Sequence, residues 1–268
     1  MKKRVLTLFV LLLVAVLSLS ACGLLQEPEE ASAPIEAIPL ATQASGDEAA
    51  EPSGASAPTA APTDAPPTAE AVATQPTAEP TSEPAAAPAS APRIYTIDQA
   101  ASQVRFQLDE DLRGQRITVV GLTDQVAGQL SVDLADLSQT QVGVIQINAR
   151  TLLTDNNFRN RAIQNEILDT GQYEFITFTP TGIEGLPASA AVGEPITFML
   201  NGDLTIRDVT LPASFTVEAT AVSDTQITGT ATAVVNRADY GLQIPSVPNV
   251  ANVEEEVELY IDFTANAS

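Results

Sequence analysis

The sequence predicts an all-β domain at its C-terminal end, an eight-stranded antiparallel barrel with one short helix, preceded by a disordered linker. Three observations predict this organisation. Apolar and polar residues alternate with period two through most of residues 93–268, as in strands that bury one face. A single stretch at about residues 156–168 has helical spacing instead. All aromatic residues except Phe9 lie from Arg93 onward, so only this part of the chain carries the material of a core.

The N-terminus has the layout of a secretory signal. Lys2, Lys3 and Arg4 precede an apolar run over residues 5–19, which is shorter than the roughly 20 residues of a membrane-spanning helix. Small residues then lead to Cys22, and Leu19-Ser20-Ala21-Cys22 resembles the bacterial lipobox. This resemblance implies that residues 1–21 are a lipoprotein signal peptide and that lipid on Cys22 anchors the protein to the extracytoplasmic face of the cell membrane. The alternative is an ordinary signal peptide with an incidental cysteine.

Residues 22–92 are predicted to be a lipid-anchored disordered linker. Within this range, Gln26 to Pro92 contains 13 of the 19 prolines and 11 acidic residues, but no Lys, Arg or aromatic residue. Such a composition buries too little apolar surface to offset the entropy of ordering the backbone. At about 3.1 Å per residue, a fully extended linker would reach on the order of 200 Å.

The predicted domain, residues 93–268, is acidic, and its composition excludes several functions. It holds nine Arg and 23 acidic residues, with no Lys and no His. A basic face for nucleic acid is therefore absent. Because the chain has no His and Cys22 is its only cysteine, it has no Ser-His-Asp or Cys-His arrangement, and a zinc site is not expected. We expect no enzyme activity, no cofactor and no metal, and a run at Glu254-Glu255-Glu256 is interpreted as a charged turn.

Nine segments account for about eight antiparallel strands. Each has one apolar and one polar face, and closure into an up-and-down barrel would remove exposed edges. The segments are 94–108, 117–120, 126–134, 141–149, 173–180, 196–206, 215–221, 227–235 and 257–263.

One helix interrupts the strands. Thr154-Asp155 is its expected cap, four apolar residues fall near one face, and Gly171 is its expected stop.

Several strand positions predicted to face inward carry small residues, and two interpretations stay open for them: curvature of the barrel, or the wall of a cavity. These positions are Gly128, Gly202, Gly229, Ala231 and Ala233.

The predicted domain contains six motifs in order along the chain: Tyr95-Thr96-Ile97-Asp98, Gly128-Gln129-Leu130-Ser131-Val132-Asp133, Thr154 to Arg161, Tyr173 to Phe178, Gly202 to Thr210, and Asn236 to Leu242. In this order they resemble the YceI-like family of bacterial lipocalin-like barrels linked to polyisoprenoid binding. The resemblance covers Ile94 to about Ala265. Many family members carry a His-Ser pair where this chain has Ala101-Ser102, so no histidine contact transfers.

The resemblance implies a lipocalin-like barrel that holds a polyisoprenoid or similar amphiphilic lipid. The alternatives are a filled core, and an envelope stress-response or surface interaction module that uses the barrel as a scaffold and its loop Gly182 to Gly193 for contact. Arg159, Arg161 and Arg237 are candidates for binding a polar head group, since a guanidinium matches phosphate. The apolar candidates for the lumen are Phe106, Leu130, Val132, Ile147, Phe178, Phe198, Leu200, Leu204, Ile206 and Phe215.

Overall fold

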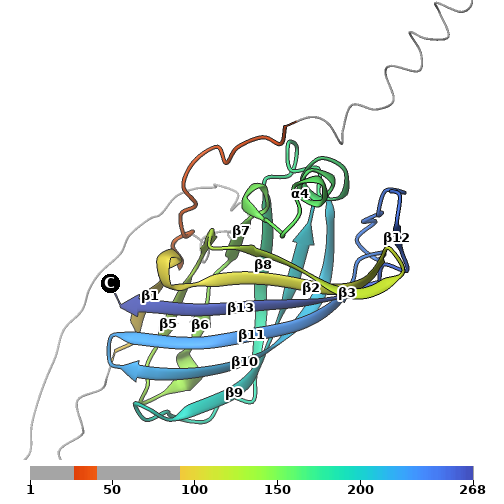
Figure 1. The fold of residues 1–268 in the computed structure, drawn as a ribbon. Helices are drawn as coiled ribbons and strands as arrows, with labels where there is room; N and C mark the ends of the chain where they lie inside the picture. The colour runs from red at the N-terminus through yellow and green to blue at the C-terminus, as the bar shows by residue number, and fades with distance from the viewer. Residues whose placement is uncertain (1–26, 41–90, 268) are drawn as a thin grey trace, which may run out of the picture.

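The computed structural model describes residues 27–40 and 91–267. The predicted signal peptide, Cys22 and most of the predicted linker lie outside these residues. The described part is mostly β, with a strongly curled antiparallel sheet and one 11-residue helix (Figure 1). The strands are β1 (Arg93–Ile97), β2 (Gln103–Leu112), β3 (Gln115–Thr123), β4 (Val126–Ala127), β5 (Gln129–Val132), β6 (Gln141–Val142), β7 (Ile145–Asn148), β8 (Phe175–Glu184), β9 (Pro195–Ile206), β10 (Val209–Ser223), β11 (Gln226–Asn236), β12 (Val250–Ala251) and β13 (Glu256–Ala267).

The sheet runs in the order β4-β7-β8-β9-β10-β11-β13-β1-β5-β6, and β2 joins it through β13. β13 pairs with β11 on one side, and on its other side it pairs first with β2 and then with β1. β4 and β5 are separated only by Gly128, yet they pair with β7 and β1 at distant points of this order. The sheet must therefore curl strongly, and it forms a half-barrel.

The predicted antiparallel β-domain with one short helix is confirmed. The predicted closed barrel of eight strands is a strongly curled half-barrel, with 13 strands within the described residues. Predicted strands break at polar and glycine positions. The alternation predicts one continuous strand over residues 94–108, but the 3₁₀ turn η2 (Gln99–Ala101) divides it. The carboxylate of Asp98 accepts a hydrogen bond from Ala100 N at 3.1 Å and so competes with strand pairing. Gly128 divides β4 from β5, which pair with different strands.

The helix consists of α4 (Asn157–Ala162) continued by the π-helical turn η5 (Ile163–Ile167). Its cap is Asn156, whose Oδ1 accepts from Phe158 N at 2.9 Å and Arg159 N at 3.2 Å. The cap therefore lies one residue beyond the expected Thr154-Asp155. Short 3₁₀ turns η3 (Leu137–Gln139) and η4 (Ala149–Thr151) complete the elements.

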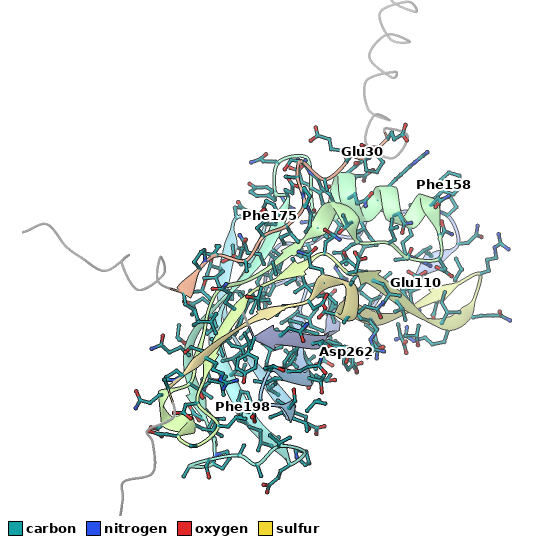
Figure 2. The ribbon with its side chains drawn as sticks, turned by 90° about the vertical axis from the view of Figure 1, so that its left-hand side faces the viewer. Glu30, Glu110, Phe158, Phe175, Phe198 and Asp262 are labelled. Atoms are coloured by element: carbon teal, nitrogen blue, oxygen red, sulfur yellow. The ribbon has the colours of Figure 1, made fainter. Side chains whose placement is uncertain are left out.

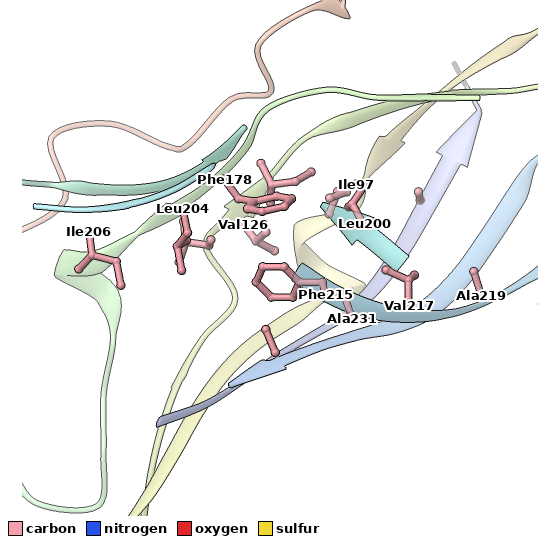
Figure 3. Packing of buried hydrophobic residues seen from close by; sticks show 14 of the residues in the cluster. Ile97, Val126, Phe178, Leu200, Leu204, Ile206, Phe215, Val217, Ala219 and Ala231 are labelled. Carbon is pink, nitrogen blue, oxygen red and sulfur yellow. The ribbon is translucent and has the colours of Figure 1, made fainter. Parts of the chain in front are cut away.

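The interior is lined by the apolar faces of the long strands. Leu200, Leu204 and Ile206 of β9 face Phe215 and Val217 of β10, and all five are buried. Figure 3 shows these side chains converging from both strands. The period-two pattern thus places one face of each long strand in the lumen.

Gly202 is required by close packing. A Cβ at this position would lie 2.5 Å from the Thr179 carbonyl oxygen and 2.6 Å from Cζ of Phe178. Gly229 similarly leaves room for the Phe263 ring. These glycines therefore seat aromatic rings across the strands and do not form the wall of an empty space.

Residues 27–40 lie against the domain, although the sequence predicted them to be part of a disordered linker. Ile35 is only 4% exposed, and its carbonyl oxygen accepts a hydrogen bond from Gln99 at 2.6 Å. Ser32 donates from its backbone N and its Oγ to the Glu174 carboxylate, at 2.9 and 2.6 Å. These contacts supply the burial and hydrogen bonds that composition alone did not predict. We name residues 27–40 the docked segment.

We predict that Gly202→Ala destabilises the domain by about 1–3 kcal/mol, because the added methyl overpacks the Phe178 ring. Gly182→Ala is the matched control: Gly182 lies in the neighbouring strand β8, and a methyl added there would have no neighbour within 4 Å. Its change in unfolding free energy should stay within about 0.5 kcal/mol. Urea denaturation measures both variants, and equal losses would contradict this packing role.

Docking of residues 27–40 should weaken in acid. Burial alone would raise the pKa of Glu174, but hydrogen bonds from Ser32 and Asn148 and the charge of Arg150 hold that pKa below its usual value. The docking contribution is therefore complete above the ordinary glutamate pKa and is lost as the pH falls through the lowered one. Protonation of Glu174 should thus accompany release of the docked segment.

Methyl NMR of Ile35 in the full chain measures this release as a shift toward the solvent-exposed resonance. Glu174→Gln should remove most of this pH-dependent shift, whereas Glu218→Gln, at an exposed position of β10, should leave it unchanged. An unchanged step in Glu174→Gln would show that this carboxylate does not control docking.

Candidate functional site

The curled sheet encloses two cavities. The larger has a volume of about 480 Å³ and lies at the end of the sheet covered by α4 and η5. The smaller, of about 110 Å³, lies toward the opposite end. Of the predicted lumen residues, Phe106, Ile147, Leu204 and Ile206 line the larger cavity, and Leu130, Val132, Phe198 and Leu200 line the smaller one.

Phe178 and Phe215 separate the two cavities. They line both, and their rings meet edge to face with centroids 4.9 Å apart and planes at 69°. Phe178 comes from β8 and Phe215 from β10, so the two rings meet over β9, which lies between these strands in the sheet. Figure 3 shows the two rings side by side. Both rings are almost fully buried, and edge-to-face packing of this kind adds about 0.5–1.5 kcal/mol to their burial.

The mouth of the larger cavity is apolar. Of the loop residues between β11 and β13 that line the cavity, Ile244, Pro245, Val247 and Pro248 are at least partly exposed, as is Phe158 at the start of α4, and we place the mouth between them. Phe158 is 66% exposed, the highest value among the exposed large apolar side chains of the described residues. We name this set the mouth rim; it comprises Phe158, Ile244, Pro245, Val247 and Pro248.

A buried ion pair lies in the wall of the larger cavity. Nη2 of Arg159 contacts Oε1 of Glu110 at 2.8 Å, and the two side chains are only 16% and 7% exposed. Nη1 of Arg159 contacts Asp155 at 2.6 Å, but that carboxylate is 86% exposed. Arg159 thus carries one buried and one readily solvated partner, in a lining that is mostly apolar.

Glu110 was not among the predicted site residues, although the sequence carries a signal for it. Val104, Phe106 and Leu108 alternate along β2, and Glu110 occupies the next position of that apolar face. A carboxylate at such a position needs a partner, because an unpaired buried charge is costly. Figure 2 shows Glu110 at the same end of the molecule as Phe158, with Phe198 toward the other end.

The other two predicted arginines have different places. Arg237 lines the larger cavity, but its guanidinium donates to the carbonyl oxygens of Leu242 at 3.0 Å and Glu254 at 2.9 Å, and to the Glu255 carboxylate at 2.7 Å. It therefore holds the loop between β11 and β13 in place. Arg161 lines neither cavity.

A polar cluster lies where β2 pairs with β13. The guanidinium of Arg105 stacks 4.0 Å from the ring centroid of Tyr260, and Tyr260 donates to Glu258 at 2.8 Å. Hydrogen bonds from Tyr260 and Gln107 hold the pKa of Glu258 below its usual value. This cluster joins β2 to β13, and Arg105 and Tyr260 are also among the residues that line the larger cavity.

Residues 27–40 and 91–267 contain no group of three or more His, Cys, Asp or Glu side chains able to hold a metal ion. The acidic run at Glu254 and Glu255 instead pairs with Arg116 and Arg237. Among the same residues, no helix has the length and apolar character needed to cross a bilayer.

Residues 95–265 match the family model of the YceI-like domain. The chain belongs to the YceI-like family. This confirms the family resemblance predicted from the six motifs. Members of this family of binding domains are generally not enzymes. No curated protein matches the chain.

Two solved structures share the YceI-like fold of this chain. A polyisoprenoid binding domain from Saccharophagus degradans, implicated in plant cell wall breakdown, is 17% identical with a TM-score of 0.53, over 65% of this chain and 98% of that one. BcnA from Burkholderia cenocepacia is 18% identical with a TM-score of 0.51, over 63% of this chain and 99% of that one. At these identities the matches establish the shared fold.

We predict that Arg159→Met lowers the free energy of unfolding by about 3–5 kcal/mol, because it leaves the Glu110 carboxylate buried without a partner. The double variant Glu110→Leu/Arg159→Met should recover most of this loss. Asp155→Asn, which removes only the exposed partner, should change stability by less than about 1 kcal/mol. Urea denaturation of the variants measures this double-mutant cycle. A double variant that loses as much stability as the two single variants together would contradict the coupling between Glu110 and Arg159.

Proposed function

We propose that this protein is a membrane-anchored, extracytoplasmic binding protein that holds a polyisoprenoid or similar amphiphilic lipid. For this purpose the curled sheet works as the predicted lipocalin-like barrel, with the chain on either side of Gly128 bridging its two ends. The observation that carries the proposal is the larger cavity, which is apolar throughout except for a few polar groups that include a buried ion pair.

The cavity suits the apolar chain of such a ligand. Its volume of about 480 Å³ lies within the range of about 300–1,000 Å³ that is usual for small-molecule sites. Its walls are aliphatic and aromatic side chains from β2, β9, β10 and β13, which offer dispersion contacts without directional demands. The family relationship and the polyisoprenoid binding ascribed to the Saccharophagus domain support the same class of ligand.

Arg159 is the best placed group for a polar head. Its Nη2 is held by buried Glu110, which fixes the guanidinium in the cavity wall. Its Nη1 is occupied only by the exposed carboxylate of Asp155. A phosphate, carbonyl or hydroxyl oxygen entering from the mouth would therefore compete with Asp155, an exchange that costs little because exposed ion pairs contribute about 0–1 kcal/mol.

The anchor in this proposal is acylated Cys22, supported by the lipobox resemblance and by the lack of any second cysteine. Two or three acyl chains on one residue give stable attachment, whereas a single chain is marginal. No step of the proposal requires catalysis.

A scaffold function is the second candidate. A depression of about 650 Å³ outside the lumen is bordered by Gly182, Gly185 and residues 186–188, which belong to the loop predicted to contact partners. An envelope stress-response or surface interaction module would use this depression, and its lumen would carry no lipid.

We predict that Leu259→Trp reduces the lipid recovered with the full chain, because Leu259 lines the larger cavity and the larger indole would project into the space proposed for the lipid chain. Val234→Trp is the matched control, since Val234 lies on the adjacent strand β11 and is 61% exposed. Solvent extraction and native mass spectrometry measure the bound lipid, and extraction leaves covalent acyl chains on the protein. Equal lipid in both variants, or none in the unaltered chain, would favour the scaffold function.

A further inference from the structure

The docked segment is held at points along most of its length. Glu29 pairs with Arg150 at 2.9 Å, and the carbonyl oxygen of Glu30 accepts from the same guanidinium at 3.0 Å. Ser32 and Ile35 follow with the contacts described above. Leu40 N then donates to the Gln129 side chain at 3.3 Å. The contacts therefore extend from η4 to β5, and the docked segment runs along the domain from the first of these elements to the second.

The first residues of the docked segment lie at the end of the domain that carries the cavity mouth. Glu30 and Phe158 appear together at one end in Figure 2, and Phe198 lies toward the opposite end. Figure 1 shows the segment running from the neighbourhood of α4 toward β1 and β5. The chain thus enters the domain beside the mouth rim.

Because of this direction, only the short stretch from Cys22 to Glu27 connects the proposed lipid anchor to the domain. Five peptide units separate Cys22 from Glu27, and a trans chain spans at most about 3.3–3.6 Å per residue, or about 18 Å in total. Residues 41–90 begin and end on the domain, since Leu40 contacts β5 and Arg93 starts β1. They consequently add nothing to the reach of the anchor while the segment stays docked.

If the long strands stand perpendicular to the membrane, the end of the domain opposite the cavity mouth cannot reach the membrane that holds Cys22. β10 has 15 residues, which at about 3.3 Å each span about 50 Å, well beyond an 18 Å tether. The near end also carries the exposed apolar side chains suited to a lipid interface. Phe158 is 66% exposed, and Leu153, just before the helix, is 56% exposed.

We infer that the docked segment turns the mouth of the larger cavity toward the membrane and that the mouth rim inserts into the lipid surface. This inference rests on the proposed acylation of Cys22. The partner is the bilayer itself, and insertion removes Phe158 and its neighbours from water as in an interfacial helix, whose apolar face enters about 5–10 Å. A lipid chain then passes between bilayer and cavity without crossing water.

The chain has no Trp, so single tryptophans report depth directly. We predict that Phe158→Trp, in the full lipidated chain on phosphatidylcholine vesicles with brominated acyl chains, is quenched several-fold more than Val192→Trp. Val192 is the matched control because it is 51% exposed and lies in the loop before β9, at the opposite end of the domain. Equal quenching, or stronger quenching of Val192→Trp, would overturn the inference.

A second variant tests the docked segment. Ile35→Asp in the Phe158→Trp chain should undock residues 27–40 and lower the quenching to the Val192→Trp level, while the protein still floats with vesicles. Quenching that persists in this variant would show that the docked segment does not set the orientation.

Flotation of the unaltered chain and of Cys22→Ser separates this inference from the anchor. If the unaltered chain fails to float, the anchor fails and the inference with it. If it floats and Cys22→Ser does not, but the two tryptophans are quenched alike, only the orientation is wrong.

Discussion

The fold depends on the way β13 satisfies its backbone hydrogen bonds on both edges. One edge pairs with β11 along that whole strand, and the other edge changes partner from β2 to β1. Because a buried strand cannot leave peptide groups unpaired, this change brings the N-terminal strands against the C-terminal one. It also sets Leu259, Ile261 and Phe263 in a row along the lumen, so a single strand contributes to both cavities.

The long strands could be predicted because their two faces differ in polarity over many residues. β9, β10, β11 and β13 all include the segments expected from alternation, with ends that differ by a few residues. The breaks were harder to predict. Asp98 ends β1 through a side-chain hydrogen bond, and the division at Gly128 depends on which strands lie on either side in space. Alternation predicts which face of a strand a residue lies on, but it does not predict which strands pair with that strand.

The site could be predicted only in part for the same reason. All ten apolar candidates line one or the other cavity, since their inward direction follows from parity. The division of the lumen by Phe178 and Phe215 depends on a contact between β8 and β10, which sequence spacing does not reveal. The roles of Arg159 and Arg237 depend on Glu110 and on loop carbonyl groups far away in the chain. Docking of residues 27–40 rests on Ile35 and Ser32 and on contacts of Glu29, Glu30 and Leu40, within a composition that otherwise indicates disorder.

The ring pair of Phe178 and Phe215 also gives the lumen a measure of length. In the proposed binding function, a lipid chain that entered from the mouth would meet these rings before it reached the smaller cavity. A shorter chain would fill the larger cavity only. A longer chain would either leave its excess outside the mouth or displace both buried rings, and uptake through that displacement would be slow. Chain-length selectivity would thus be kinetic, and it would reside in two phenylalanines that never contact the head group.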